Sequence, residues 1–416
     1  MTMSIKMKDS GIDWIGEIPE HWSVKRLGEL YVQRNERVSD KEYPPLSVTM
    51  KGILPQLETA AKTNDGDNRK LVKKGDFVIN SRSDRRGSCG ISDYDGSVSL
   101  INTVLCPKWE MIANFYNWLF HAPNFSDEYY KWGHGIVDDL WTTRWTEMKK
   151  ICVVSPPIEE QQFIADFLDK KIGEIDSAIK EANNLIDKYK SYKQSIITKA
   201  VTKGIIPNVS MKDSGLPWIG EIPEHWRVMP NKYVMYKVKE IQDIYNNEDI
   251  LSLSTDGVKI RDLDAGGKMP TTFDGYQKVN PGRLLMCLFD IDVTPRCIGL
   301  IKDEGLTSPA YSQFVVRENG YAPYYYYYYL NLDFDKILVH LAKNLRHSLT
   351  EDQLGAINVL VPSLSEQKAI ADYLDDKCSQ IDSIIESKNN LIKQLQEYKK
   401  SIIFEYVTGK KEVPNG

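Results

Sequence analysis

A segment of sixteen residues occurs twice in this chain, almost unchanged. Met7–Trp22 reads MKDSGIDWIGEIPEHW and Met211–Trp226 reads MKDSGLPWIGEIPEHW, so that only two positions differ. A longer segment also recurs, because residues 160–202 match residues 366–408. The stretches between the matched segments are largely unrelated in sequence. The chain is therefore a tandem duplication with constant and variable parts, which predicts a scaffold that holds two different recognition modules.

Length and composition fit two or more soluble domains. A chain of 416 residues exceeds one typical core. Hydrophobic content of 42% and aromatic content of 10% are ordinary for a globular protein. No apolar run is long enough to span a membrane, and the first residues lack an apolar signal core. We therefore expect a cytoplasmic protein that has no membrane contact.

The cysteines and the net charge point to no metal centre and to no obvious ligand class. The six cysteines include no CxxC pair, so we expect reduced thiols and no metal site. A net charge of −5 gives no global sign of nucleic-acid binding. A binding footprint is a local patch, however, and acidic helices elsewhere can hide it. The charge must therefore be examined segment by segment.

The repeated sixteen-residue segment, which we call the strap, has a structural character. Its Gly and Pro residues prevent a regular helix, and its Trp and Ile residues favour burial. We expect an extended strap that packs on its module. A histidine beside a tryptophan in such a segment is more often structural than catalytic, so we expect His21 and His225 to have structural roles.

The two variable modules, residues 23–155 and 227–361, mix short β-rich runs with turns and brief helices, which predicts an α+β fold. A common plan is visible inside them. Lys74–Phe77 lies where Pro281–Leu284 does, and Cys89–Ile91 resembles Ile298–Leu300. The modules are therefore predicted to share one fold and to differ in their surfaces.

Six consecutive tyrosines occupy positions 324–329 of the second module. The corresponding place in the first module, residues 114–120, is also aromatic. Stacking on nucleic-acid bases is one interpretation of such a run. Because a helix cannot place six consecutive side chains on one face, we instead predict a helix with part of the set buried.

The long repeats predict two long helices. Apolar residues recur at alternating steps of three and four over nearly five heptads, and charges fill the other faces. Each helix is expected to have about 40 residues and a length of about 60 Å. Proline precedes each start, and Gly204 and Gly409 mark the ends. The core positions are predicted to include Ile172, Ile175, Ile179, Ile186 and Ile196 in the first helix, and Ile381, Ile385, Ile392, Leu395 and Ile402 in the second.

The simplest closure packs these two helices against each other in antiparallel orientation, which gives a pseudo-twofold internal repeat. Lys193 and Lys399 would then lie close to Asp375 and Asp169 respectively. A polar residue at a core position costs stability but fixes the register of a coiled coil. The predicted domains are a first recognition domain with its strap (1–155), the first long helix (156–204), a second recognition domain with its strap (205–361), the second long helix (362–410) and a tail (411–416).

This layout resembles the specificity subunit of type I restriction-modification enzymes over nearly the whole chain. The most specific shared features are the two straps, the ending DKYKSYKQSIITKAVTKG, and the opening of the first long helix. The second opening departs from the pattern, since Ser363 replaces the second proline. The first opening consists of Pro156, Pro157, Glu160, Gln161, Ile164, Ala165, Leu168 and Asp169.

The resemblance implies a non-catalytic subunit with two target recognition domains, each reading half of a split, asymmetric sequence in double-stranded DNA. The paired helices would act as a ruler and as the docking surface for two modification subunits. Those subunits would carry S-adenosylmethionine and methylate adenine. Restriction subunits, which would use ATP and Mg²⁺, would join for cleavage. No cofactor is expected on this chain itself.

Candidate DNA contacts in the first module lie in two stretches. A loop that follows a strand-like run is rich in arginine, which suits guanine or phosphate, and a basic cluster just upstream suits phosphate. Polar groups also lie later in the module, before the strand that leads into the long helix. The candidates are Arg69, Lys70, Lys73 and Lys74, then Arg82, Arg85 and Arg86, and finally His134, Thr143 and Arg144.

The equivalent stretches of the second module have a different chemistry. The loop Asp290–Arg296 is far less basic, and its carboxylates are suited to accept hydrogen bonds from cytosine. The later stretch, residues 343–348, carries amide, guanidinium and imidazole groups that suit base edges or phosphates. The candidates are Arg296, Lys343, Asn344, Arg346 and His347.

Two other functions compete with DNA reading. The tetrapeptide Ser155–Ile158 looks like the SPP-aromatic motif of amino-methyltransferases, but Ile158 stands where an aromatic residue is needed for stacking. No glycine-rich loop for S-adenosylmethionine follows any predicted strand. The second alternative is a coiled-coil scaffold that binds proteins and no DNA. The low global basicity favours the scaffold, and the polar loops of the variable modules argue against it.

Overall fold

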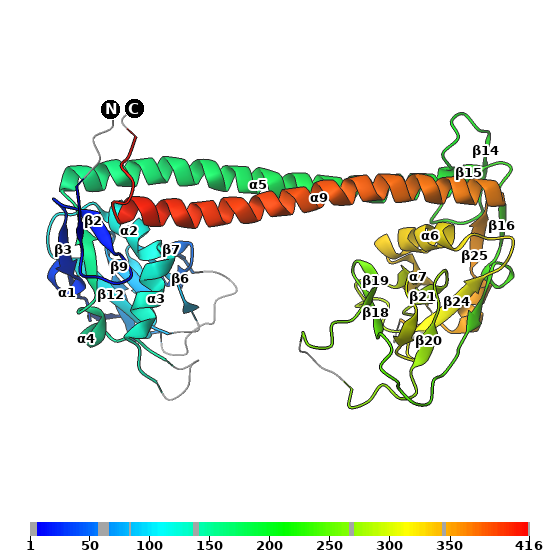
Figure 1. The fold of residues 1–416 in the computed structure, drawn as a ribbon, viewed down its shortest axis with the longest axis horizontal. Coiled ribbons are helices and arrows are strands. Elements are labelled where there is room, and N and C mark those ends of the chain that lie inside the picture. Colours follow the sequence, from blue (N-terminus) through cyan, green and yellow to red (C-terminus); the bar gives the residue numbers. More distant parts are fainter. Residues whose placement is uncertain are drawn as a thin grey trace. The chain divides into compact units, whose positions relative to one another are not determined.

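The computed structural model describes residues 6–56, 66–82, 85–135, 141–265, 270–342 and 347–414 (Figure 1). The chain forms two compact units. Unit 1 comprises residues 1–182 and 389–416, and unit 2 comprises residues 183–388. Each unit thus contains one strap, one module, part of the long helix α5 (Ile158–Lys203) and part of the long helix α9 (Leu364–Val407). None of the helices in the described ranges is both long and apolar enough to span a bilayer.

Each strap is a small β-hairpin, so the expectation of an extended segment is wrong. In unit 1, β1 (Met7–Asp9) pairs antiparallel with β2 (Glu17–Pro19), and in unit 2, β14 (Met211–Asp213) pairs with β15 (Glu221–Pro223). The chain reverses because the Gly11 N–H donates to the Asp9 carboxylate and Gly11 has a φ of 68°. Gly215 repeats both features with Asp213.

The two modules contain the same four-stranded antiparallel sheet. In unit 1 the strand order is β10-β9-β12-β4, and in unit 2 the equivalent order is β22-β21-β24-β17. Phe77 pairs with Ile91 in the first sheet, as Leu284 pairs with Leu300 in the second. The common plan predicted from sequence is therefore confirmed. The strands are β4 (Tyr31–Gln33), β9 (Phe77–Asn80), β10 (Cys89–Ile91), β12 (Asn102–Pro107), β17 (Met235–Val238), β21 (Leu284–Met286), β22 (Ile298–Leu300) and β24 (Ser312–Val316).

Smaller sheets and helices complete each module. Unit 1 adds β3 (Ser23–Arg26), α1 (Leu27–Leu30), β5 (Arg37–Val38), β6 (Leu46–Thr49), β7 (Gly52–Pro55), β8 (Arg69–Val72), β11 (Gly96–Val98), α2 (Ala113–His121), α3 (Pro123–Lys131), α4 (Trp145–Met148) and β13 (Cys152–Ser155). Unit 2 adds β16 (Arg227–Pro230), η3 (Asn231–Tyr233), β18 (Leu251–Ser254), β19 (Gly257–Ile260), β20 (Gln277–Val279), β23 (Gly305–Thr307), α6 (Ala322–Phe334), α7 (Ile337–Leu341), α8 (Glu351–Ala356) and β25 (Asn358–Val361).

A glycine at the same place in each sheet allows a hairpin to pack closely against it. A Cβ atom on Gly90 would lie 2.8 Å from the Cα of Gly52, which belongs to the hairpin β6–β7. A Cβ atom on Gly299 would lie 2.5 Å from the side chain of Val258 in the hairpin β18–β19. A side chain at either position would therefore push the hairpin away from the sheet.

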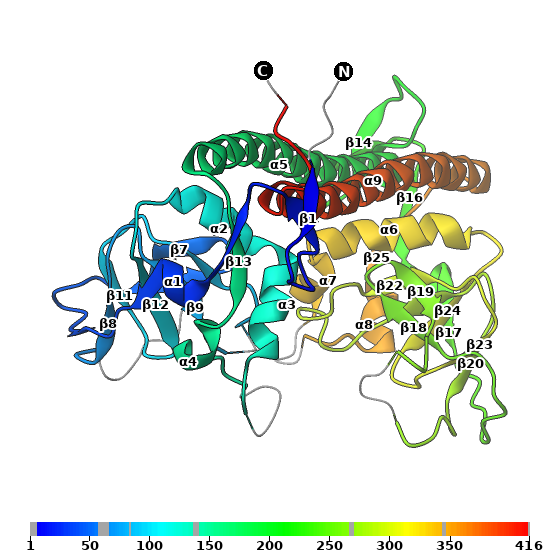
Figure 2. The same ribbon diagram turned by 60° about the vertical axis from the view of Figure 1, so that its left-hand side comes forward.

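The tyrosine run forms part of α6 and faces the interior of unit 2. In both views α6 lies between α9 and the sheet (Figures 1 and 2). Five of the six tyrosines are buried and Tyr326 is half-buried, which confirms the predicted helix. The Tyr324 hydroxyl donates to the carbonyl of Val201, and the Tyr325 hydroxyl donates to that of Leu360. These rings build the core and do not stack on bases.

Within each unit the long helices run antiparallel. In unit 1 the ring of Phe167, early in α5, lies 4.5 Å from that of Tyr406, late in α9. A glycine with a left-handed backbone follows each helix. Gly204, directly after α5, has a φ of 74°, and Gly409, two residues after α9, has a φ of 71°. The predicted core positions face the partner: Ile172, Ile175, Ile186, Ile381 and Ile402 are buried, and Ile179, Ile196, Ile385, Ile392 and Leu395 are half-buried.

The two lysines of the coiled coil have partners other than those predicted. Lys193 Nζ lies 2.6 Å from a carboxylate oxygen of Asp382, and Lys399 Nζ lies 2.6 Å from one of Asp176. Each partner lies one heptad after the predicted Asp375 or Asp169. Those two carboxylates instead bind the aromatic helix of their own module, which leaves the next acidic position for the lysine.

Candidate nucleic-acid interface

The opening of each long helix holds a module in place. Glu160 accepts a 2.8 Å hydrogen bond from the Trp22 indole and pairs with His21 at 2.7 Å, which fixes the strap. The buried Gln161 accepts a hydrogen bond from the backbone N–H of Ile112, which precedes α2, and donates to the carbonyl of Pro156. His21 therefore has a structural role in this contact, as expected.

Asp169 completes the attachment from one side of α5. Its carboxylate accepts hydrogen bonds from the side chains of Asn114 and Trp118 on α2, at 2.9 and 2.8 Å. Unit 2 repeats the arrangement, because Glu366 binds His225 and Trp226, Gln367 binds the N–H of Tyr321, and Asp375 binds the Tyr327 hydroxyl. The helix-opening motif thus anchors each module rigidly to a long helix.

The tetrapeptide Ser155–Ile158 belongs to the same attachment. Ser155 ends β13 and accepts a hydrogen bond from the Tyr116 hydroxyl at 3.3 Å, and Pro156 is buried. The segment is a strand-to-helix junction that carries the Gln161 contact. Its geometry favours a structural role over that of a methyltransferase motif.

In unit 1 the two predicted DNA-contacting stretches meet at the end of β9. Thr142 forms isolated β-bridges with both Arg82 and His134. The backbone N–H of Thr143 donates to the carbonyl of Ser81, the residue that follows β9. Side chains that are separated by about 50 residues in the sequence therefore share one edge of the sheet.

The side chains at this edge form a basic surface. Arg82, Arg85, Arg86, His134 and Arg144 are all exposed. The Arg86 guanidinium lies 5.0 Å from the centre of the Tyr130 ring and 3.5 Å from the Asp127 carboxylate. Guanidinium groups held on a rigid sheet edge suit both guanine and phosphate. We call these five residues the basic edge.

Three candidates of the first module are buried, and their assignment to DNA is corrected. Arg69 and Lys70 lie on β8 with exposed fractions of 5% and 8%. The Arg69 guanidinium donates to Ser97, and the Lys70 ammonium donates to the carbonyl of Asn102 at 2.6 Å. Burial lowers the pKa of the Lys70 ammonium. Thr143 is fully buried and donates to the carbonyl of Tyr129.

The neighbouring lysines differ from these buried groups. The Lys73 ammonium lies 3.3 Å from the Asp95 carboxylate and 4.9 Å from the centre of the Tyr43 ring. Lys74 is exposed. Of the four cations in this cluster, Lys74 is thus the best placed for phosphate.

Replacing Lys74 with methionine is expected to reduce the salt dependence of DNA binding, whereas the same change at Lys70 should leave it unaltered. Each phosphate contact adds about 0.9 to the slope of log K against log salt concentration. The slope can be measured with a labelled duplex titrated with the assembled complex at several salt concentrations. A reduced slope in the Lys70→Met variant would contradict the structural role of Lys70.

In unit 2 the two corresponding stretches meet in the same way. The backbone N–H of Leu349 donates to the carbonyl of Leu288 at 2.8 Å, which matches the contact of Thr143 with Ser81. His347 Nδ1 lies 3.0 Å from the Asp292 carboxylate, and this contact lowers the pKa of Asp292. Arg296 is half-buried. Lys343, Asn344 and Arg346 lie outside the described residues.

Several features of this region were not foreseen from the sequence. Val293 projects from the loop after β21 with an exposed fraction of 74%, and Phe289 is exposed beside it. In unit 1 the exposed Met50, at the tip of the hairpin β6–β7, approaches Gly87 of the arginine-rich loop. The short β-runs on both sides of Met50–Lys51 could have indicated that hairpin. No pattern in the sequence marks Val293.

Comparison with known proteins finds similar sequences. A model of the type I restriction modification DNA specificity domain matches residues 300–397. The type I restriction enzyme MjaVIII specificity subunit of Methanocaldococcus jannaschii is 25% identical, over 96% of this chain and 95% of that protein. A candidate MjaX specificity subunit of the same organism is also 25% identical, over 95% of each chain. Over nearly its whole length, the chain is similar to specificity subunits of type I restriction-modification enzymes.

Solved structures agree with this specificity-subunit fold. A chain from a study of complex assembly and conformational transition in the type I R-M system has a TM-score of 0.72 and 13% identity, with 95% of this chain and 99% of that chain covered. The HsdS subunit from Thermoanaerobacter tengcongensis has a TM-score of 0.50 and 16% identity, over 95% and 98% of the two chains. At such identities the likeness concerns the fold. The predicted architecture of two α+β modules with two long helices is confirmed.

Proposed function

We propose that this specificity subunit reads a bipartite, asymmetric DNA sequence and brings modification and restriction subunits to it. The observation that carries the proposal is the pair of equivalent loop junctions, one at the end of β9 and one after β21. The two junctions stand on equivalent sheets, one in each unit, and differ in chemistry. A shared scaffold with different reading surfaces is what recognition of two unlike half-sites requires.

The two surfaces favour different bases. The basic edge of unit 1 offers arginine forks, which suit guanine and the flanking phosphates. The loop after β21 offers the exposed Asp290 and Val293, a carboxylate for the cytosine amino group and an apolar side chain for the thymine methyl. Tethering two such readers also raises affinity, since the second contact becomes intramolecular.

The subunit supplies sequence recognition and leaves the chemistry to its partners. Modification subunits would bring S-adenosylmethionine, and restriction subunits would bring ATP and Mg²⁺. Within the described ranges, the structure contains no cluster of His, Cys, Asp and Glu side chains suited to a metal ion. The long helices, which carry exposed side chains such as Tyr192 and Tyr398, are the surface we propose for docking.

Mapping N6-methyladenine in DNA from cells that express the chain with modification subunits tests the proposal. We expect methylation within one motif that consists of two specific half-sites around a non-specific spacer. A matched culture without this chain should lack that methylation. Methylation without a bipartite motif in the presence of the chain would contradict the proposed role.

A coiled-coil scaffold without DNA contact is the second candidate, favoured by the low global basicity. The assembled complex should retain short duplexes in a salt-sensitive and sequence-selective manner if the subunit reads DNA. If the complex retains no duplex, the scaffold is favoured.

A further inference from the structure

The loop that follows β21 is fixed to the rest of its module at both ends. The backbone N–H of Cys287 donates to the carbonyl of Cys297, which closes the loop at its base. Ile291 is fully buried, and its N–H donates to the carbonyl of His347. Within the loop, the carbonyl of Asp290 accepts from the N–H and the hydroxyl of Thr294. We call residues 288–296 the reading loop.

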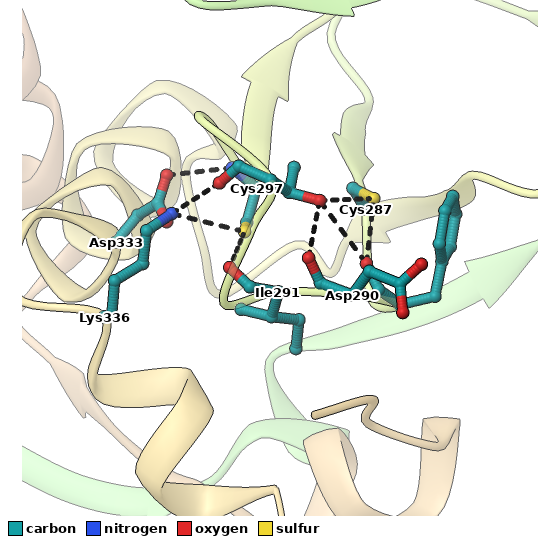
Figure 3. Close-up of polar contacts among 8 residues, drawn as sticks. Cys287, Asp290, Ile291, Cys297, Asp333 and Lys336 are labelled. Atoms are coloured by element: carbon teal, nitrogen blue, oxygen red, sulfur yellow. Dashed lines mark hydrogen bonds and ion pairs between the residues drawn. The ribbon is translucent and has the colours of Figure 1, made fainter. Parts of the chain in front are cut away.

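An ion pair with a buried carboxylate attaches the far end of the reading loop to the helical layer (Figure 3). Asp333, near the end of α6, accepts a 2.8 Å hydrogen bond from the N–H of Cys297 and pairs with Lys336 Nζ at 2.8 Å. The same Lys336 ammonium donates to the carbonyl of Thr294 at 2.6 Å. Two backbone groups at the end of the loop are therefore held by one lysine–aspartate pair.

The environment of this pair shows that it serves the loop. The Asp333 side chain is 5% exposed, so its carboxylate is satisfied by the protein. Lys336 has a left-handed φ of 50°, which is uncommon for a residue other than glycine or asparagine. In this conformation the ammonium reaches the carbonyl of Thr294. The nearby Cys297 thiol is fully buried, and burial raises its pKa, so it remains protonated.

The first module attaches its loop in another way. There the Arg86 guanidinium, itself part of the basic edge, lies 3.5 Å from Asp127 on α3, and both side chains are largely exposed. Solvent-exposed pairs of this kind are weak and easily broken. The contact at the Arg86 loop of unit 1 is therefore exposed, whereas the reading loop of unit 2 is held by a carboxylate that is only 5% exposed.

We propose that Lys336 and Asp333 are positioning residues that set the base selectivity of the second module. The inference rests on the proposed function, since it assigns the reading loop to one half-site. Neither residue needs to touch DNA. A short loop that reads bases with one carboxylate and one apolar side chain has few contacts, so displacement by about 1 Å removes its selectivity. Preorganisation also lowers the entropy cost of binding.

The test compares selectivity at the two half-sites in the same complex. Methylation rates are measured on the cognate duplex and on duplexes with one base pair changed in either half-site. The half-site read by unit 1 is identified with an Arg85→Ala variant. Lys336→Met is expected to lower discrimination at the other half-site about tenfold and to leave discrimination at the unit 1 half-site unchanged. Lys336→Arg, which retains the cation, should keep discrimination within about threefold of the wild type.

Two further variants separate positioning from a general loss of structure. Asp333→Asn keeps an acceptor for the N–H of Cys297 but removes the charge that holds Lys336, so it should reproduce the selective loss. Lys131→Met removes the exposed Lys131–Glu128 pair of α3, which has the same i,i+3 spacing, and it should change neither half-site. Hydrogen exchange in α6 verifies that each variant remains folded.

The outcomes are distinguishable. Wild-type discrimination in both Lys336→Met and Asp333→Asn would overturn the inference, and so would an equal loss at both half-sites. If the wild-type complex discriminates at neither half-site, the proposed function itself fails, and the inference fails with it.

Discussion

Replacing Gln161 with alanine is expected to lower the free energy of unfolding of unit 1 by about 2–4 kcal/mol, because one buried and one partly buried backbone group lose their partner. The side-chain oxygen accepts from the N–H of Ile112 at 3.1 Å, and the side-chain nitrogen donates to the carbonyl of Pro156 at 2.9 Å. Denaturant unfolding, followed by hydrogen exchange in α2, measures the loss.

The chain supplies a matched control at the next position. Gln162 is the same residue type on the same turn of α5, but its side chain is exposed. It donates a hydrogen bond to Asp166, one turn later. Gln162→Ala should change the free energy of unfolding by less than about 0.5 kcal/mol. Equal effects of the two changes would contradict the role assigned to Gln161. The equivalent change Gln367→Ala should weaken unit 2 in the same manner, since Gln367 repeats these contacts.

The duplication made the architecture predictable from the sequence. Heptad spacing predicted both long helices, and the similar segments Cys89–Ile91 and Ile298–Leu300 predicted that the two modules share one fold. Periodicity and recurring glycines report on local geometry, which the sequence encodes directly. Helical periodicity also predicted that the tyrosines at positions 324–329 form a helix and that part of the set is buried.

The sequence-based predictions that proved wrong all concern tertiary contacts. Arg69 and Lys70 had the composition of a phosphate-binding cluster, but the fold buries both on β8 and satisfies them with Ser97 and Asn102. The partner of Lys193 moved by one heptad, because Asp375 binds Tyr327. Sequence spacing indicates which residues could meet. It does not indicate which acceptor another side chain has already occupied.

The candidate interface was predictable in part. The residue types and their approximate stretches were predictable, because both modules place polar loops before the strand that leads to a long helix. The sequence did not predict that the two stretches meet at the end of β9, through the bridges of Thr142. Nor did the sequence predict the Lys336–Asp333 pair, which it presents as an ordinary i,i+3 pair on a helix end.

Replacing Arg85 with alanine should weaken binding to the cognate sequence by about 1–3 kcal/mol, which corresponds to roughly 5- to 150-fold in affinity. The N–H of Arg85 donates to the carbonyl of Arg82, and the carbonyl of Arg85 accepts from the N–H of Ser88. The backbone is therefore held, and the exposed guanidinium extends from a fixed base. A held backbone lowers the part of the entropy cost of binding that comes from the main chain.

Arg85→Lys separates the two ways in which this side chain can act. If Arg85 contacts guanine through its planar fork, lysine should not restore selectivity at that base pair, because an ammonium lacks the fork. If it contacts only phosphate, lysine should restore affinity and the salt dependence with it. The measurement is the methylation rate and duplex affinity of the assembled complex on cognate and singly substituted sites.

Arg26→Ala provides the control, since Arg26 is an exposed arginine of the same unit that lies on β3 beside the strap. It removes the same charge and should leave selectivity unchanged. Arg26 lies on β3, which pairs with the strand that enters α5. The variant therefore tests whether any loss of positive charge in unit 1 is enough to reduce binding. Equal losses in Arg26→Ala and Arg85→Ala would reduce the basic edge to a general electrostatic contribution, and recognition by unit 1 would then have to reside in other side chains of the module.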